Sequence, residues 1–193
     1  MGNIKDFVIE QGVLKAYKGC DTHITIPNGI IVIGERAFEY GTSLISITLP
    51  STVTSIGSHA FFECCDLASI TIPDSVKSIG KGAFYRCLSL KKIILPNAVT
   101  RIEKNTFYEC CSLRSITIPA SVSSIEAEAF SCCTALKEVI LPASVTSIGH
   151  YAFWNCQSPT HIYYADSEET FKNIQGADKI SDLAKIKMHF GKE

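Results

Sequence analysis

Cysteine is the residue whose number and spacing in this sequence could support the most chemistry. The 193 residues include nine cysteines. Five of them recur at one constant interval along the chain: Cys64, Cys87, Cys110, Cys133 and Cys156. The others are Cys20, Cys65, Cys111 and Cys132. Such a set could bind zinc, form disulfides or provide a redox-active thiol.

The spacing argues against these uses. Zinc sites favour cysteines about two to four residues apart, and the sequence has no C-x-x-C motif. Cysteines stacked on successive repeats would have Cα atoms about 5 Å apart, but their parallel Cβ vectors suit a disulfide poorly. We therefore predict no metal and no cofactor, and interpret the recurring cysteines as small buried residues. A thiol- or metal-dependent protein that uses this column is the alternative.

Other catalytic groups are missing. The five histidines form no continuous column of the repeat, and no glycine-rich phosphate or dinucleotide motif occurs. We predict that the protein is not an enzyme. The formal net charge of −1 lacks the basic footprint of a nucleic-acid-binding protein. No apolar run approaches the roughly 18 residues of a membrane helix, so we predict no membrane insertion.

The repeat extends through most of the chain. Six prolines keep the same interval as the cysteines, without insertion or deletion: Pro27, Pro50, Pro73, Pro96, Pro119 and Pro142. Six phenylalanines also keep it: Phe38, Phe61, Phe84, Phe107, Phe130 and Phe153. Each unit reads L-x-x-I-x-I-P-x-x-V-x-x-I-G-x-x-A-F-x-x-C. The I-x-I step predicts a strand that proline ends, and the A-F-x-x-C spacing predicts a short helical turn.

A unit of this length cannot bury its apolar stripe alone, but stacked units bury a continuous core. We therefore predict an α/β solenoid of 23-residue repeats. A parallel strand ladder would form one face and short helical turns the other.

The repeated unit resembles the BspA-type leucine-rich repeats of bacterial and some protist surface proteins. The resemblance implies a right-handed leucine-rich-repeat solenoid forming a single domain over residues 1–193. "FVIEQGVLKAYKG" is similar to the family's N-terminal hairpin, which implies a cap over residues 1–20. Repeats would then occupy 21–165. "IYYADSEETFKNI" and "LAKIKMHF" resemble its C-terminal helix–strand cap, over 166–193, with capping-box spacing from Asp166 to Glu169.

The sequence departs from the common leucine-rich pattern at one position. Small residues replace the usual asparagine, and we expect them to line a corner of each coil: Thr52, Ser75, Ala98, Ser121 and Ser144.

The outward face of the strand ladder is the first candidate binding surface. It would present mostly small hydroxyls: Thr25, Ser46, Thr48, Ser69, Thr71, Lys92, Ser115, Thr117 and Glu138. His23, Ile94 and Ile140 complete this strip. Leucine-rich repeats commonly bind partners on this face, an inference from the family. Alternatively, threonine simply favours exposed strand positions.

An aromatic stripe is the second candidate, at the position after each core phenylalanine. Four of its six members are aromatic: Phe62, Tyr85, Tyr108 and Trp154; the other two are Glu39 and Ser131. Stacked aromatics could recognise a partner, or could lie flat and cover the turns beneath them.

We predict a non-catalytic protein-interaction module, and the resemblance implies surface adhesion or recognition. The partner would be a protein or a glycan, and the chain would be a monomer. It would lie at the cell surface or be secreted if a leader has been removed, and would otherwise be cytoplasmic. A structural spacer from a larger surface protein is a further alternative.

Overall fold

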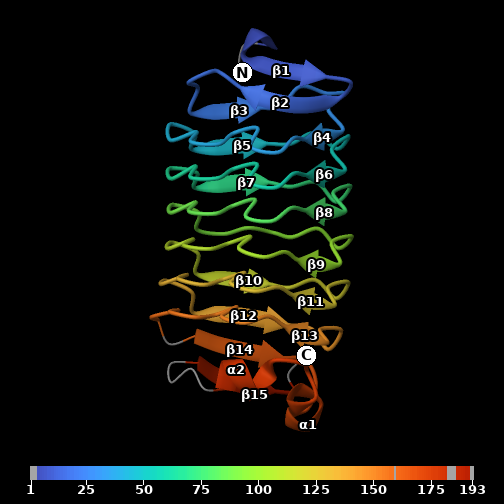
Figure 1. The fold of residues 1–193 in the computed structure, drawn as a ribbon, viewed down its shortest axis with the longest axis vertical. Helices are drawn as coiled ribbons and strands as arrows, with labels where there is room; N and C mark the ends of the chain where they lie inside the picture. The colour runs from blue at the N-terminus through green and yellow to red at the C-terminus, as the bar shows by residue number, and fades with distance from the viewer. Residues whose placement is uncertain (1–3, 159, 182–185, 192–193) are drawn as a thin grey trace.

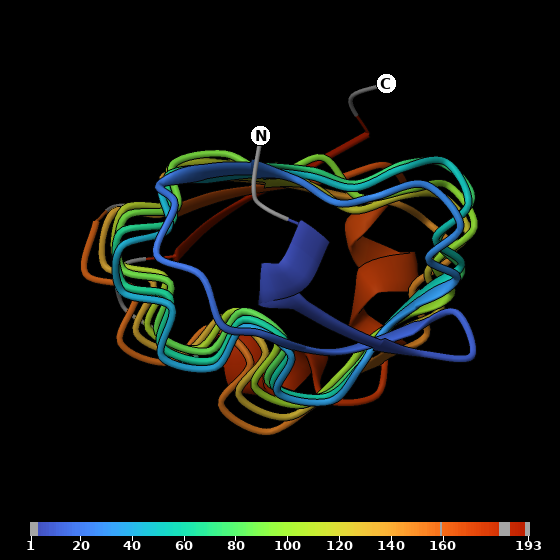
Figure 2. The same cartoon turned by 90° about the horizontal axis from the view of Figure 1, so that it is seen from above.

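The chain winds into a stack of about seven coils of about 23 residues each. The computed structural model describes residues 4–158, 160–181 and 186–191. Residues 4–17 and residues 166–181 lie at opposite ends of the stack (Figure 1). Seen along the stack, the coils superpose around one interior (Figure 2), as the constant period requires. The predicted solenoid of parallel strands is confirmed.

The predicted strand ladder forms, with one gap. Its strands pair in parallel at a shift of one repeat, so that Ile24 lies beside Ile47 and Ile47 beside Ile70. The first part contains β3 (His23–Thr25), β5 (Ser46–Thr48) and β7 (Ser69–Thr71). The second part contains β10 (Ser115–Thr117), β12 (Glu138–Leu141), β14 (Thr160–Tyr164) and β15 (Ile186–Phe190).

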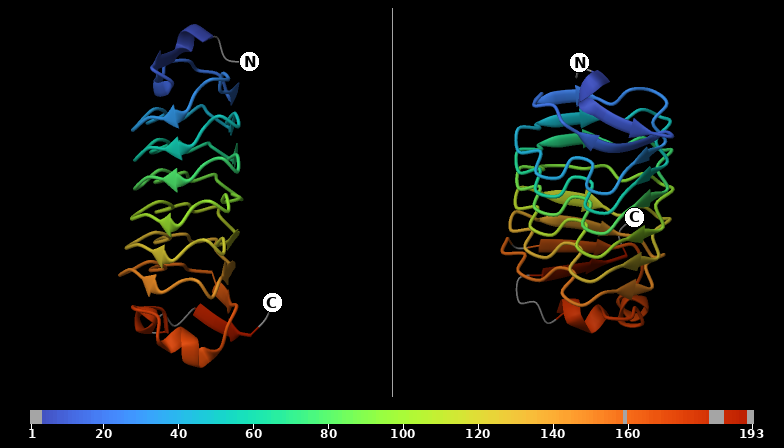
Figure 3. Two further views of the ribbon diagram at one scale, coloured as in Figure 1. Left: turned by 90° about the vertical axis from the view of Figure 1, so that its right-hand side faces the viewer. Right: turned by 45° about the horizontal axis from the view of Figure 1, so that its top comes forward.

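A second ladder, which the sequence analysis does not predict, lies after each proline. It uses the V-x-x-I step, and the isoleucine that ends each two-residue strand is buried. Its strands are β4 (Val32–Ile33), β6 (Ser55–Ile56), β8 (Ser78–Ile79), β9 (Arg101–Ile102), β11 (Ser124–Ile125) and β13 (Ser147–Ile148). Most coils therefore have two strand segments, visible on separate sides of the stack in Figures 1 and 3.

The remaining edge consists of turns, and here the predicted helical turns are wrong. Two residues per coil have positive φ, for example Arg36 at 57° and Tyr40 at 59°. An α-helix cannot continue through left-handed residues at that spacing. Their N–H groups donate to the next coil instead, Arg36 to the carbonyl of Ser58 at 3.1 Å and Tyr40 to that of Phe62 at 2.8 Å. This edge is therefore a third ladder between coils.

The core is one continuous column of apolar side chains. The six repeated phenylalanines stack on one another, with ring centroids 5.1–5.5 Å apart and planes within 10°. Each ring is nearly or completely buried. Every coil thus shields the apolar face of the next, which explains why no single repeat needs a core of its own.

The small residues predicted at the asparagine position do line a corner, and their hydroxyls have a role there. Each donates a hydrogen bond of 2.6–2.8 Å to a carbonyl of the preceding coil. The four donors are Thr52, Ser75, Ser121 and Ser144. Ala98 has no hydroxyl, so the fourth coil cannot form this bond to the third.

Both strand ladders are interrupted at this same fourth coil. The pattern predicts a strand around Ile93 and Leu95, and both side chains are buried, but residues 91–95 form no strand. The second ladder also stops between β8 and β9. The turn edge stays bonded, with the N–H of Gly82 donating to the carbonyl of Lys104 at 2.9 Å. The turn edge and the apolar column therefore hold the third and fourth coils together.

Both ends of the stack are covered. A short 3-10 turn (Ile4–Asp6) leads into β1 (Phe7–Glu10) and β2 (Val13–Tyr17), an antiparallel hairpin whose second strand pairs with β4. At the other end α1 (Glu168–Lys172) and α2 (Ala177–Ser181) precede β15, which extends the first ladder.

The first of these helices begins one residue later than the capping-box spacing indicates. Its N-cap is Ser167 and not Asp166, because the Ser167 hydroxyl accepts the hydrogen bond from the N–H of Thr170.

Removing a ring from the middle of the phenylalanine stack should destabilise the fold strongly. We expect Phe84→Ala or Phe107→Ala to lower the free energy of unfolding by about 3–5 kcal/mol, because each leaves a cavity between two coils. Thr71→Ala, at an exposed strand position, should cost less than about 1 kcal/mol. Urea denaturation of the variants measures the difference. Equal losses for the buried and the exposed changes would contradict the assignment of inner and outer faces.

Candidate interaction surfaces

The outward strand strip is flat and mostly polar. Thr25, Thr48 and Thr71 are exposed and lie beside one another on β3, β5 and β7, while the isoleucines between them are buried. Ser69, Ser115, Thr117 and Glu138 are also exposed, and Ser46 is half-buried. Lys92 is exposed, but it lies in the irregular segment of the fourth coil. The structure therefore brings most of the predicted strip together and interrupts it near its middle.

The interruption leaves a hollow of about 330 Å³ in the strip. Asp74, Lys92, Ile94, Ser115 and Thr117 contribute to its lining. Ile94 is 70 % exposed, and the described structure has no hydrogen bond to the backbone groups of residues 92–95. An apolar side chain and solvated polar groups thus lie side by side at the centre of the strip.

A row of basic side chains borders the strip, and the sequence analysis does not single it out. Lys91, Arg114 and Lys137 occupy the position five residues before successive prolines, and all three are exposed. The constant period of the repeat contains the signal for this row. It is missed because the same position holds Ile45 and Ala68 in the two preceding repeats.

The aromatic stripe is stacked for only part of its length. Phe62 and Tyr85 have ring centroids 4.9 Å apart, and Tyr85 and Tyr108 have centroids 4.7 Å apart. These three rings are half-buried, in keeping with a covering of the turns. Ser131 is buried at the next step, and Trp154 beyond it is 47 % exposed. A hollow of about 370 Å³ touches Tyr108, Ser131 and Trp154.

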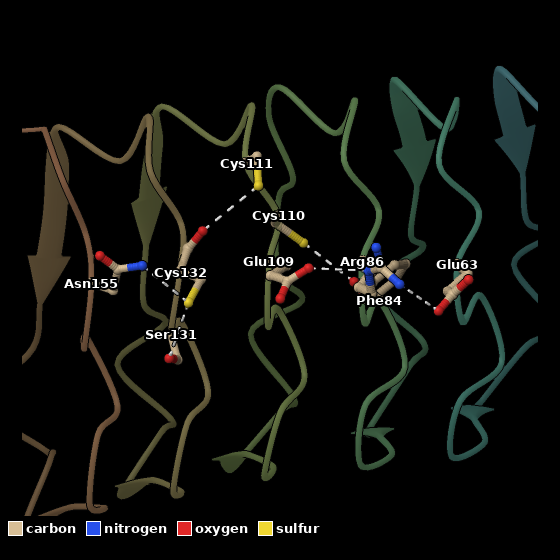
Figure 4. A network of polar contacts seen from close by, with 9 residues as sticks. All are labelled: Glu63, Phe84, Arg86, Glu109, Cys110, Cys111, Ser131, Cys132 and Asn155. Atoms are coloured by element: carbon tan, nitrogen blue, oxygen red, sulfur yellow. Dashed lines mark hydrogen bonds and ion pairs between the residues drawn. The ribbon is translucent and has the colours of Figure 1, made fainter.

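The column beside the aromatic stripe contains a paired charge network (Figure 4). An Arg86 Nη atom lies 2.9 Å from Glu63 Oε1, and Arg86 Nε lies 3.0 Å from Glu109 Oε2. The hydrogen bond to Glu63, with the charges of both carboxylates, raises the pKa of Arg86. One cation on the middle coil thus pairs with an anion on each of the two neighbouring coils.

Further along the same edge, Cys132 accepts hydrogen bonds from polar side chains. The Ser131 hydroxyl lies 3.8 Å from its sulfur and the Asn155 amide 3.5 Å from it. The Cys111 thiol donates to the Cys132 backbone carbonyl at 3.8 Å. The residue is itself buried, and these contacts stabilise the turns.

The five column cysteines are buried, as predicted, and also form a ladder of hydrogen bonds. Each thiol donates to the carbonyl of a core phenylalanine, at 3.0 Å from Cys64 to Phe38 and at 3.1 Å from Cys133 to Phe107. The other donors are Cys87, Cys110 and Cys156, at 3.2–3.4 Å. A thiol is small enough for the core, and it adds a second hydrogen bond to a carbonyl that already accepts one from a backbone N–H.

Burial keeps these thiols protonated. It raises the pKa of Cys64 and of Cys156 from 9.0 to about 12. It raises the pKa of the three thiols between them well above 9.0, because each lies wholly inside. A thiolate, the form that attacks or binds a metal, is therefore disfavoured in this column.

The structure has no disulfide among the nine cysteines. Within the described residues, no group of three or more His, Cys, Asp or Glu side chains is placed to hold a metal ion. Two histidines that the sequence analysis leaves unrelated do meet: His161 Nδ1 and His189 Nε2 lie 2.9 Å apart on β14 and β15. Their ring planes differ by only 14°, which suits a hydrogen bond between the two imidazoles.

The repeated coils, two strand ladders and capped ends define a leucine-rich-repeat solenoid. Residues 14–110 and 54–177 match the BspA type leucine rich repeat region, in six copies. The chain belongs to this family. A family of this kind supports a role in protein interaction or as a surface protein.

Solved bacterial structures share the fold. A leucine-rich repeat protein of T. pallidum is 29 % identical with a TM-score of 0.77, over 84 % of this chain and 85 % of that one. A leucine-rich cell surface protein of Faecalibacterium prausnitzii A2-165 is 31 % identical with a TM-score of 0.62, over 84 % of this chain. A leucine-rich repeat protein of Eubacterium ventriosum is 29 % identical with a TM-score of 0.70, over 81 %.

This chain spans 38 % of the Faecalibacterium chain and 45 % of the Eubacterium chain. A comparison with curated proteins gives no match. No helix among the described residues has the length and apolar character to cross a membrane.

Thiol accessibility should separate the cysteines into two classes. In the native protein we expect Ellman's reagent to react with the exposed Cys20, and slowly with the half-buried Cys65 and Cys111, while the other six react only after unfolding. Absorbance with time measures the classes, and Cys20→Ser should remove the fast phase. Rapid reaction of the column thiols in the native state would show that burial does not protect them.

The raised pKa values also predict a loss of stability at high pH. Neutral column thiols contribute stability that is fully present below the unfolded pKa of 9.0 and is lost as the pH rises toward the folded value of about 12. We expect the unfolding temperature to fall through this range, and to fall less steeply in Cys110→Ala. Thermal scans at each pH measure this. An unchanged slope in Cys110→Ala, matched by that of the control Cys20→Ala, would rule out the column as the cause.

Proposed function

We propose that this chain is a non-catalytic interaction domain that binds a partner on its outward strand strip, in surface adhesion or recognition. The observation that carries the proposal is a rigid, flat and mostly polar strip presented by successive coils. Membership of the BspA type family supports it. The Faecalibacterium relative is itself described as a leucine-rich cell surface protein.

The way the coils are held favours binding without large rearrangement. Outside the fourth coil, three sets of hydrogen bonds between coils fix the backbone beneath the strip, and the phenylalanine stack fills the interior. A surface that is already ordered loses little conformational entropy when a partner binds. A partner of matching shape, protein or glycan, would therefore meet a preformed site on a single chain.

The strip also has the composition of a contact surface. Small hydroxyls such as Thr48 and Thr71 donate and accept hydrogen bonds at low side-chain entropy cost, while Ile94 and Ile140 add exposed apolar area. Two isoleucines within a mostly polar strip suit a mixed interface more than a purely hydrophobic one.

The strip can be tested by obstructing it. The chain would be screened against immobilised purified matrix proteins and a glycan array, and each hit measured again with the variant Thr48→Arg/Thr71→Arg/Thr117→Arg. Long charged side chains on a flat contact surface should weaken binding at least about tenfold. The matched control Ser78→Arg/Thr100→Arg/Ser123→Arg changes exposed residues of other columns and should bind as the wild type does. Full binding by the strip variant, with its fold intact, would reject this face.

A further inference from the structure

The row of basic residues beside the strip is stacked with unusual regularity. The N–H of Lys137 donates to the carbonyl of Arg114 at 2.8 Å, and the N–H of Arg114 faces the carbonyl of Lys91 at 3.4 Å. The three cations therefore lie directly above one another on adjacent coils, about 4.8 Å apart along the stack. Lys92 adds a fourth cation next to the first. We call these four residues the basic row.

Several other cations of this chain are neutralised by acids on neighbouring coils. Arg86 lies between Glu63 and Glu109, Arg101 pairs with Glu126 at 3.6 Å, and Lys104 pairs with Glu128 at 3.6 Å. Charge pairing between coils is thus the common arrangement on the turn edge and the second ladder.

The basic row has no such neutralisation. Across the part of the chain that the structure describes, none of its four cations forms an ion pair, and Glu138, which follows Lys137, is also unpaired. Like charges on directly neighbouring strands repel and destabilise a sheet. A row that costs stability in the free protein is explained if it contacts an anionic partner.

An apolar contact lies within reach of the row. The hollow of about 330 Å³ in the strip is lined by Lys92 and Ile94, and Ile94 is 70 % exposed. Ile140, which lies on β12 three residues after Lys137, is 42 % exposed. A purely anionic polymer would leave both isoleucines in water, whereas a polypeptide can cover them with aliphatic side chains.

We propose that the basic row and the hollow beside it bind an extended segment of a partner protein that combines acidic with aliphatic side chains. Carboxylates of the segment pair with the stacked cations, and an aliphatic side chain enters the hollow against Ile94. The inference rests on the proposed function, because it places the partner's main contact at one part of the same strip.

The cations also act at a distance. A row of like charges attracts an acidic segment before contact, and this attraction weakens as salt shortens the screening length. Binding at this site should therefore fall as salt rises from about 0.05 M to about 0.3 M, while contacts made only by the hydroxyls of the strip should change little.

The test uses a random twelve-residue peptide library displayed on phage and selected on the full chain. Selected peptides are expected to combine Asp or Glu with Val, Ile or Leu. Their affinity, measured by fluorescence anisotropy, should fall at least about tenfold in Lys91→Gln/Arg114→Gln/Lys137→Gln. The unfolding temperature of this variant should stay equal to that of the wild type or rise, because repulsion is relieved.

A matched control removes the same charge elsewhere. Lys15→Gln/Lys77→Gln/Lys81→Gln changes three exposed lysines of other columns and should leave peptide affinity unchanged. Ile94→Ser should weaken the peptides and leave the binding of a heparin oligosaccharide unaltered. Selection of peptides without acidic residues, equal losses in both triple variants, or binding of heparin alone would each overturn the inference.

The outcomes also separate this inference from the proposed function. One outcome is that the arginine variant of the strip weakens the binding of peptides or screened partners while the glutamine variant of the row does not. In that case the proposed function stands and the role of the basic row is rejected. If neither variant lowers the affinity for the peptides, the strip itself is rejected as the binding surface.

Discussion

The alignment of identical residues from coil to coil is the constraint on which the whole structure depends. Phenylalanine rings stack at 5.1–5.5 Å, and thiols donate to carbonyls of the preceding turn edge. Neither arrangement is possible if one repeat gains or loses a residue, because its side chains would then face the wrong neighbours. This requirement accounts for the constant repeat length that the prolines and phenylalanines show in the sequence.

The same alignment decides what the surface can be. Any residue type that recurs at one position becomes a continuous row, and so the molecule shows a hydroxyl strip, an aromatic stripe, a paired charge column and a basic row. These rows differ in whether their charged side chains are paired. Within the described residues, Arg86 is paired with carboxylates on both neighbouring coils, while the cations of the row around Arg114 form no ion pair. A surface that a fold does not need for its own stability is the better candidate for contact with another molecule.

The recurring columns predicted the buried face, the first strand ladder and the protected thiols. The second ladder was missed because two-residue strands have no alternation to detect. The A-F-x-x-C spacing does not distinguish left-handed turns from helical ones, because Ala, Phe and Cys face inward in both arrangements. The gap around Ile93 could not be predicted from the sequence, because that repeat keeps the apolar pattern and loses only hydrogen bonds. The contact of His161 with His189 depends on how the C-terminal cap folds back, which spacing alone does not show.

The junction between the third and fourth coils has a mechanical consequence. Along most of the stack, a force applied to the two ends is shared among two strand ladders, the turn edge and the corner hydroxyls. The junction between the third and fourth coils lacks the hydrogen bonds of both strand ladders and of one corner hydroxyl. The load concentrates on the turn edge and the packed rings of Phe84 and Phe107. Under tension along the stack, we expect the rod to yield first at this junction.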